Sequence, residues 1–145
     1  MLHLSADTIP SAPGAYVLAL ELLSAVEVVL PRRATVTLAP GRYLYCGSAR
    51  GPGGLKARLG RHMRQDKRVL WHIDRLTTVG HVLGAWVFTG VTECDLVARL
   101  SFLPTPVPGF GATDCERCSS HLLRGQPERY CRSNETTFQP ASRQS

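Results

Sequence analysis

The chain has 145 residues, of which 43% are hydrophobic, enough for one buried core and too few for two comfortable domains. Charged residues and prolines interrupt every apolar stretch well before the roughly 20 residues that a membrane span needs, and residues 1–14 do not have the pattern of a signal peptide. Five cysteines, an odd number scattered along the chain, favour reduced thiols over a disulfide framework. We therefore expect a soluble, cytoplasmic protein with no membrane partner.

Positive charge is concentrated in one segment of the chain. The formal net charge is +6, and eight Lys or Arg lie between Arg50 and Arg75, against only Asp66 and Asp74. Such a stripe favours a polyanionic partner, although an ordinary solvated helix face is the alternative. The sequence indicates no obligate protein partner.

Four segments near the N-terminus are typical of strands, at residues 14–23, 25–30, 35–38 and 42–47. In the last of them, the alternation of side chains along a strand puts Tyr43 and Tyr45 on one face and Leu44 and Cys46 on the other. These segments predict an antiparallel sheet.

A loop rich in Gly and Pro, residues 48–54, precedes a helix that we expect over 55–65, with an apolar stripe along one face. A short helix or turn over 71–76, a strand over 81–89 and a helix over 93–103 follow. Thr92 and Asp95 form a capping box at the start of the last helix, and the prolines after residue 103 end it. From residue 125 the chain is polar and without periodicity, which predicts a flexible tail.

The strand that ends at Gly47, the glycine-rich loop and the following helix predict an anion site. In such an arrangement, free backbone amides and the positive end of the helix dipole face one point, where a phosphate can bind. Many turns of this kind bind nothing, and that is the alternative.

Three side chains add chemistry to this arrangement. Arg58 and His62 are four residues apart, so they lie one above the other on the helix, where they offer a guanidinium fork for phosphate and a group for proton transfer. The alternative is an ordinary surface arginine and a histidine at the edge of the core. Glu93 shares a helix face with apolar residues, and an inward carboxylate favours either a divalent cation or a contact with the helix dipole.

The order of these residues resembles the GIY-YIG nuclease module: Gly14-Ala15-Tyr16, then Tyr45-Cys46-Gly47, a helix with Arg58 and His62, and a helix that begins with Glu93. Further runs resemble one branch, the Uri-type group of small stand-alone members from bacteria and archaea, formerly described as a domain of unknown function. These runs are 43–61, 71–74, 109–111, 114–115 and 120–122.

The resemblance implies an α+β fold with an antiparallel sheet of about three strands flanked by helices. It divides the chain into an N-terminal extension (1–13), a GIY-YIG-like nuclease domain (14–124) and a polar C-terminal tail (125–145). The stretch between Tyr16 and Tyr45 is longer than in many members, which implies an enlarged hairpin.

The resemblance also implies a metal-dependent endonuclease that hydrolyses phosphodiester bonds in DNA, in repair or recombination. Tyr16 would act as general base or orient the attacking water, with Tyr45 in support, and Arg58 would bind the scissile phosphate. His62 would shuttle a proton or contact phosphate, and Glu93 would hold Mg²⁺ or Mn²⁺. The residues assigned to substrate binding are Gly47, Ser48, Arg50, Lys56, Arg61 and His72.

Several residues fall outside this scheme. The asparagine that often follows the metal-binding glutamate has no clear counterpart here, and His72, Asp74, Ser120 and His121 receive no catalytic role from the resemblance. Cys115, Cys118 and His121 suggest a zinc site that still needs a fourth ligand, for which Cys131 is a candidate.

Two other functions are compatible with the sequence. One is a non-catalytic nucleic-acid-binding module that retains the fold and the basic stripe. The other is an adaptor stabilised by zinc. The enzyme is favoured because Tyr16, Tyr45, Arg58 and Glu93 occur together.

Overall fold

The computed structural model describes residues 2–111 and 118–125. The tail expected over 125–145 therefore lies almost wholly outside the described residues. In the described part, no helix combines the length and the apolar character that crossing a membrane requires. The elements are β1 (Leu2–His3), the 3-10 turn η1 (Ala6–Thr8), β2 (Gly14–Leu22), β3 (Val26–Val28), β4 (Val36–Leu38), β5 (Gly41–Ala49), α1 (Gly54–Met63), α2 (Asp74–Thr77), β6 (His81–Phe88), α3 (Glu93–Arg99) and β7 (Leu122–Arg124).

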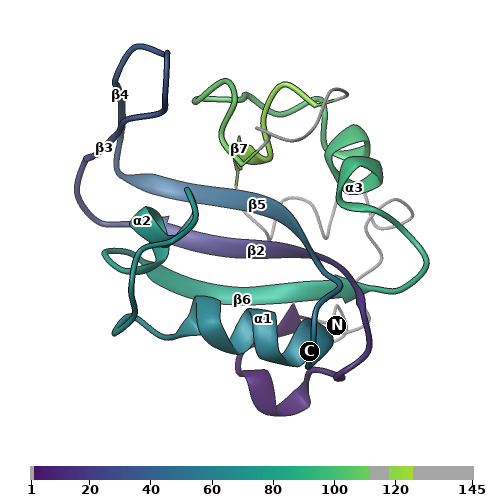
Figure 1. The fold of residues 1–145 in the computed structure, drawn as a ribbon. Helices are drawn as coiled ribbons and strands as arrows, with labels where there is room; N and C mark the ends of the chain where they lie inside the picture. Colours follow the sequence, from purple (N-terminus) through teal and green to yellow (C-terminus); the bar gives the residue numbers. More distant parts are fainter. Residues whose placement is uncertain (1, 112–117, 126–145) are drawn as a thin grey trace.

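The main sheet is antiparallel and has the order β1-β6-β2-β5-β7. Its centre is β2, which pairs with β5 over nine residues and with β6 on its other side. Figure 1 shows these three strands side by side. The α+β class is confirmed, but the expectation of about three strands was wrong: β1 and β7 extend the sheet to five. These two strands have two and three residues, too few to show an alternating pattern.

The hairpin between β2 and β5 is enlarged, as expected. Its extra residues form a separate two-stranded sheet, β3 with β4, in which Val26 lies opposite Leu38. Figure 1 shows this hairpin extending beyond one end of the main sheet. Val28 and Leu38 are buried against the main core, so the insertion adds to the core instead of standing apart from it.

The main sheet has an apolar cluster on each face. Tyr16, Tyr43 and Tyr45 belong to the cluster that contains the buried residues of α1 and α2. Leu44 and Cys46 belong to the other cluster, which is covered by α3. The predicted alternation along β5 is therefore confirmed, and burial of each large side chain contributes about 1.5–3 kcal/mol to stability.

Both longer helices begin near their expected positions. In α1, Leu55 and Leu59 are fully buried. At α3, the capping box is confirmed, because the Asp95 amide donates to the Thr92 hydroxyl (3.1 Å) and the Thr92 amide donates to the Asp95 carboxylate (2.9 Å). The helix ends at Arg99, earlier than the expected residue 103, and turns continue the chain from there.

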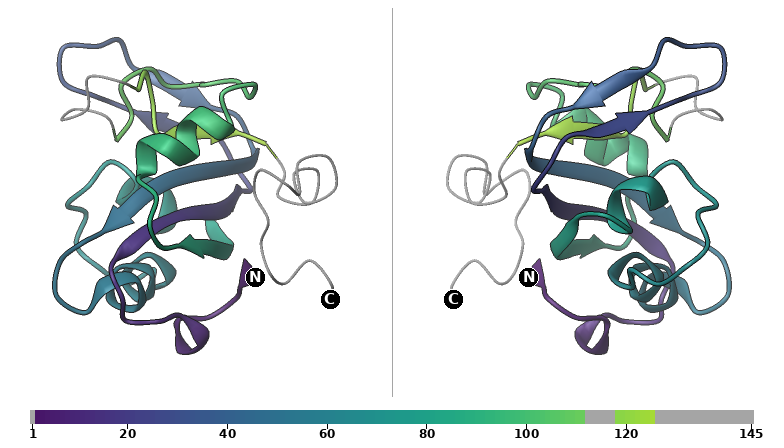
Figure 2. Two further views of the ribbon diagram at one scale, coloured as in Figure 1. Left: turned by 90° about the vertical axis from the view of Figure 1, so that its right-hand side faces the viewer. Right: turned by 90° about the vertical axis from the view of Figure 1, so that its left-hand side faces the viewer.

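The N-terminal segment packs against the start of α1. Ile9 is buried in the core, and η1 lies beside α1 in the views of Figure 1 and Figure 2. The Leu55 amide donates to the Ala12 carbonyl (2.9 Å) and the Lys56 amide to the Pro10 carbonyl (3.0 Å). Residues that the sequence treats as an extension thus contribute a strand, a core side chain and helix caps.

Candidate active site

Tyr16 and Tyr45 lie on neighbouring strands and on the same face of the sheet. Tyr16 is opposite Gly47, and Tyr45 is opposite Leu18, so the two tyrosines are diagonal neighbours with ring centroids 6.4 Å apart. A Cβ atom on Gly47 would lie 2.5 Å from Cζ and 3.0 Å from Cε1 of Tyr16. Gly47, assigned to substrate binding from the sequence, therefore leaves space for the Tyr16 ring to lie across β5.

His62, near the end of α1, completes a packed trio with the tyrosines. Its Nε2 is 2.7 Å from the Tyr16 hydroxyl, and its ring centroid is 6.3 Å from that of Tyr45. Burial and, to a smaller extent, the charges of Lys67 and Arg58 together lower the pKa of His62 to about 3. At neutral pH the imidazole is therefore neutral, and its bond to the phenol fixes the direction of the Tyr16 hydroxyl.

Both tyrosines are held in their protonated form by the surrounding structure. Burial raises the pKa of Tyr16 well above its ordinary value, and Tyr45 raises it further, whereas the charge and hydrogen bonding of Arg58 act in the opposite direction. Burial also raises the pKa of Tyr45, with a contribution from Glu93. The arrangement favours a phenol over a phenolate in the absence of bound ligands.

Arg58 connects this trio to the glycine-rich loop. Its guanidinium donates to the Ser48 carbonyl (3.0 Å), and its Cζ lies 4.4 Å from the centre of the Trp71 ring. Ser48, another residue assigned to substrate binding, thus contacts Arg58 through its backbone. Charge, planarity and partial exposure leave Arg58 suited to phosphate oxygens.

Arg61 makes more contacts within the protein than the sequence suggested. It forms an ion pair with the fully buried Asp74 (2.8 Å) and donates to the Arg68 carbonyl. Its Cζ lies 4.4 Å from the centre of the Trp71 ring, which Arg58 also contacts. Asp74 also accepts from the amides of Leu70 and Trp71. The sequence analysis did not identify Trp71 as the residue that supports both arginines. The one signal for this role was the position of an aromatic residue soon after a basic helix.

Glu93 lies at the start of α3 and is half-buried. Its charge raises the pKa of Tyr16 and Tyr45 on one face of the sheet and of Cys46 on the other. Within residues 2–111 and 118–125, its carboxylate forms no hydrogen bond or ion pair, so the donor set fits a cation ligand.

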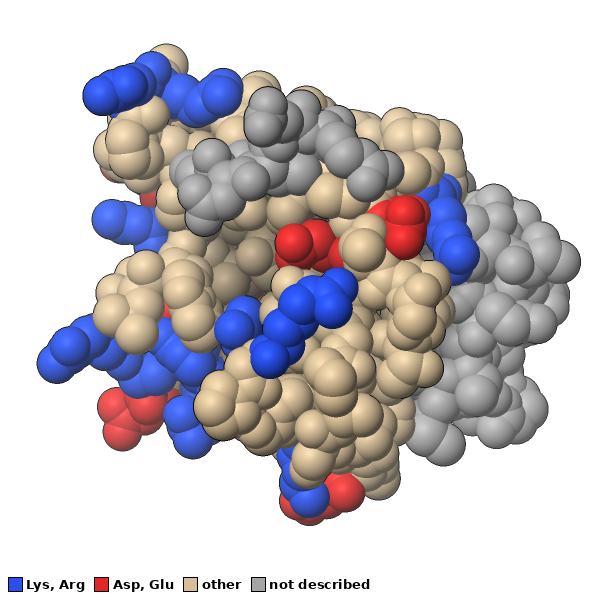
Figure 3. Space-filling model, turned by 45° about the vertical axis from the view of Figure 1, so that its right-hand side comes forward, with Lys and Arg blue, Asp and Glu red and all other residues tan. Residues whose placement is uncertain are grey.

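A surface pocket of about 190 Å³ adjoins Arg58, and its other lining residues are Ala49, Gly51, Pro52, Gly54, Ala57 and Arg61. This volume is several times the roughly 30 Å³ that one water occupies, so the pocket has room for several waters. Arg50 and Lys56 are exposed in and just after the same loop. Figure 3 shows a face on which basic side chains lie close to acidic ones.

The anion site expected at the start of α1 is contradicted by the backbone hydrogen bonds. The amides of Leu55 and Lys56 donate hydrogen bonds to carbonyls of the N-terminal segment, as described above, and the Gly54 amide donates to the Gly51 carbonyl. These amides are not available to a phosphate. The side chains of this region, above all Arg58, remain able to bind a phosphate.

The residues to which the resemblance gives no catalytic role have structural contacts. His72, also assigned to substrate binding, accepts the Gly111 amide at its Nδ1 (2.9 Å) and packs against Phe110. The Ser120 hydroxyl bonds with the amide and the carbonyl of Leu122, at the start of β7. Of the proposed zinc ligands, Cys115 and Cys131 lie outside the described residues, whereas Cys118 and His121 lie within them.

A family model described as Domain of unknown function DUF123 matches residues 15–142. The chain belongs to this family. The matched residues include the five that we expect to be catalytic, Tyr16, Tyr45, Arg58, His62 and Glu93. No curated protein and no solved structure matches it.

Proposed function

We propose that this chain is a metal-dependent endonuclease of the GIY-YIG type that hydrolyses phosphodiester bonds in DNA. The observation that carries the proposal is the packing of Tyr16, Tyr45 and His62 beside Arg58, with the Glu93 charge acting on both phenols. These groups come from two strands and two helices. Apolar packing alone does not require two phenols, an imidazole and two charged side chains in one region, because buried polar groups cost free energy unless they are paired.

Each side chain has a task in phosphodiester hydrolysis. Arg58 binds the scissile phosphate and stabilises the negative charge that develops on it. His62 positions Tyr16, whose hydroxyl orients the attacking water, since burial disfavours the phenolate that a general base requires. Tyr45 supports Tyr16 from the neighbouring strand.

Glu93 is the residue that would hold Mg²⁺ or Mn²⁺. Mg²⁺ in phosphoryl-transfer sites is often bound by one or two carboxylates, with waters and substrate oxygens as the remaining ligands. When bound, such a cation polarises the phosphate and lowers the pKa of coordinated water.

The exposed positive charge supports a nucleic-acid substrate. Arg50, Lys56, Arg64 and Arg68 are exposed around α1, and they can contact phosphates on either side of the one that is cleaved. Such contacts carry no information on base sequence. We therefore propose DNA without a defined sequence as the substrate class.

The test is cleavage of supercoiled plasmid, single-stranded and branched DNA in Mg²⁺ or Mn²⁺. Glu93→Ala and Arg58→Ala are expected to slow cleavage by at least about a hundredfold, as does loss of one transition-state donor in other enzymes. Arg58→Lys keeps the charge but not the planar fork, so it restores only part of the rate. Glu27→Ala, an exposed carboxylate on β3, is the matched control and retains full activity.

A second candidate function is a DNA-binding module without catalysis. It is favoured by the burial of Tyr16, which is only 1% exposed, together with the exposed basic residues around α1. DNA binding by fluorescence anisotropy, measured at two salt concentrations, distinguishes the two functions. Wild-type protein that binds in a salt-sensitive way but cleaves no substrate with either metal would establish the binding module.

A further inference from the structure

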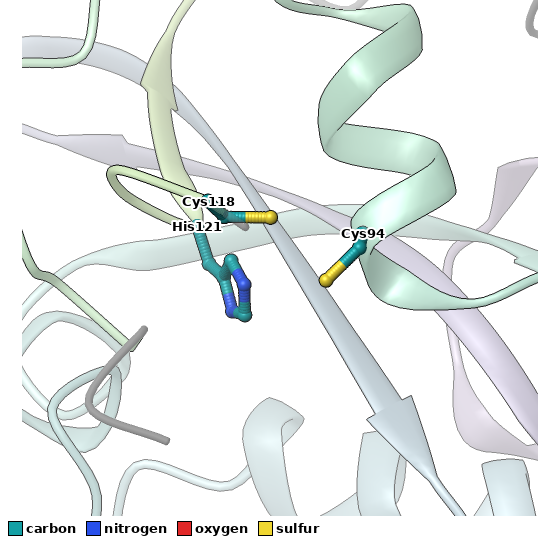
Figure 4. A group of neighbouring side chains, drawn as sticks. All are labelled: Cys94, Cys118 and His121. Atoms are coloured by element: carbon teal, nitrogen blue, oxygen red, sulfur yellow. The ribbon is translucent and has the colours of Figure 1, made fainter. Parts of the chain in front are cut away.

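Three potential soft-metal ligands from distant parts of the chain lie together beside α3. They are Cys94 in the first turn of α3, and Cys118 and His121 in the segment that leads into β7. One ligand atom from each, two thiol sulfurs and an imidazole nitrogen, lies within 4.8 Å of the others. Figure 4 shows the sulfur atoms and the ring directed toward a common space. The sequence pairs Cys118 with His121 but does not indicate Cys94.

The spacing of these atoms is close to that of a zinc site. With Zn–S bonds of about 2.3 Å and Zn–N bonds of about 2.0–2.1 Å, ligand atoms at the corners of a tetrahedron are roughly 3.3–3.8 Å apart. Atoms within 4.8 Å of one another reach that spacing by a movement of about 1 Å, which small side-chain rotations provide. Thiolate and imidazole ligands favour Zn²⁺ over the hard cations that carboxylates prefer.

His121 provides an independent indication of a ligand. The residue is only 3% exposed, and its Nε2 has no hydrogen-bond partner in the described part of the chain. A buried polar nitrogen is normally paired, so the Nε2 of His121 has the capacity to bond a partner that the structure does not contain. The His121 backbone is fixed, because its amide donates to Phe110 (2.8 Å) and its carbonyl accepts from Cys46 (2.9 Å).

We propose that Cys94, Cys118 and His121 bind one Zn²⁺ ion, which joins the first turn of α3 to the segment before β7. Water or a further side chain completes the tetrahedron. The capping box at Thr92 fixes the backbone of Cys94 on one side, and the sheet fixes His121 on the other. The site is therefore held in place before the ion arrives. Glu93 precedes Cys94, so the ion also fixes the position of that carboxylate.

The test begins with the metal content of the full chain, purified without an affinity tag that binds metals. We expect about one zinc per chain by mass spectrometry of the metal. Replacement of zinc by Co²⁺ is expected to give the thiolate charge-transfer and visible bands of a tetrahedral cobalt site. Cys94→Ser and His121→Ala are expected to weaken zinc binding by about a hundredfold or more, because each removes one of few ligands.

Two controls keep the test independent of folding and of nuclease activity. Cys94→His retains a zinc ligand at the same position and is expected to keep the metal, whereas His81→Ala changes an exposed histidine on β6 and leaves zinc binding unchanged. Every measurement reads metal binding, so an inactive nuclease does not affect the result. Circular dichroism identifies any variant that fails to fold.

Three outcomes would overturn the proposal. The first is wild-type protein that binds neither Zn²⁺ nor Co²⁺ under reducing conditions. The second is metal binding that survives both Cys94→Ser and His121→Ala. The third is a disulfide between Cys94 and Cys118, detected as two thiols that react only after reduction. This outcome overturns the proposal when the reduced protein still binds no metal.

Discussion

Substitution of Gly47 by alanine tests the geometry of the proposed active site most directly. Gly47 has an ordinary strand conformation, so an alanine here is strained only by its surroundings. Without a neighbour, alanine in a strand is more stable than glycine by about 0.5–1 kcal/mol. Here, however, the added Cβ would overlap the hydroxyl end of the Tyr16 ring. Because Tyr16 is 1% exposed and packed on His62, the ring cannot move freely, and overpacking of this kind costs about 1–3 kcal/mol.

The assay is urea denaturation, with Gly51→Ala as the matched control. A Cβ on Gly51 would meet nothing within 4 Å, so this variant is expected to be neutral or slightly more stable than wild type. Tyr16→Leu, which lacks the outer ring atoms, should abolish most of the cost of Gly47→Ala, giving a coupling of about 1–3 kcal/mol in the double-mutant cycle. Equal stabilities of Gly47→Ala and Gly51→Ala would refute the close packing of Tyr16 on β5.

Three further predictions concern the supports of the site. Asp74→Asn is expected to destabilise the fold by about 2–4 kcal/mol, because it removes a fully buried carboxylate and leaves Arg61 without its ion pair; urea denaturation against the exposed Asp66→Asn measures this. His62 has a folded pKa of about 3 against 6.5 in the unfolded chain, so between these values the unfolded chain binds the extra proton and stability falls as pH falls, by about 5 kcal/mol at most. His62→Gln should remove this pH dependence, and an unchanged slope from pH 4 to 7 would contradict the burial of a neutral imidazole. Thr92→Ala should cost about 1 kcal/mol through loss of the α3 cap, whereas Thr92→Ser should not, as measured by thermal unfolding.

Local patterns in the sequence predicted the parts of the fold that depend on local physics. Alternation along β5 placed Tyr43 and Leu44 on opposite faces, and the spacing of Thr92 and Asp95 predicted a capping box. Both follow from backbone geometry within a few residues. The resemblance to the GIY-YIG module implied that Tyr16, Tyr45 and His62 belong to one site, and the three rings do lie together.

Contacts between distant segments were not predictable in the same way. The carbonyls of Pro10 and Ala12 occupy the amides at the start of α1, and no periodicity encodes which carbonyl reaches them. β1 and β7 join the sheet edges through pairs of only two and three residues. Cys94 meets Cys118 and His121 only because α3 and β7 both pack against β5. Each of these depends on tertiary packing, which overrides what a short window of sequence shows.

The first turn of α3 connects the two proposals made here. A helix of seven residues is too short to be stable alone, so the position of its first turn depends on the capping box, on packing of Leu96 and, as we propose, on the metal at Cys94. Tyr16 and His62 are held by the central strand and α1 and do not depend on that turn. Removal of zinc should therefore weaken the contribution of Glu93 while the tyrosine cluster and the basic surface remain. Chelated protein is expected to bind DNA as before and to require a higher Mg²⁺ or Mn²⁺ concentration for cleavage, whereas equal loss of binding and cleavage would mean that zinc supports the whole fold.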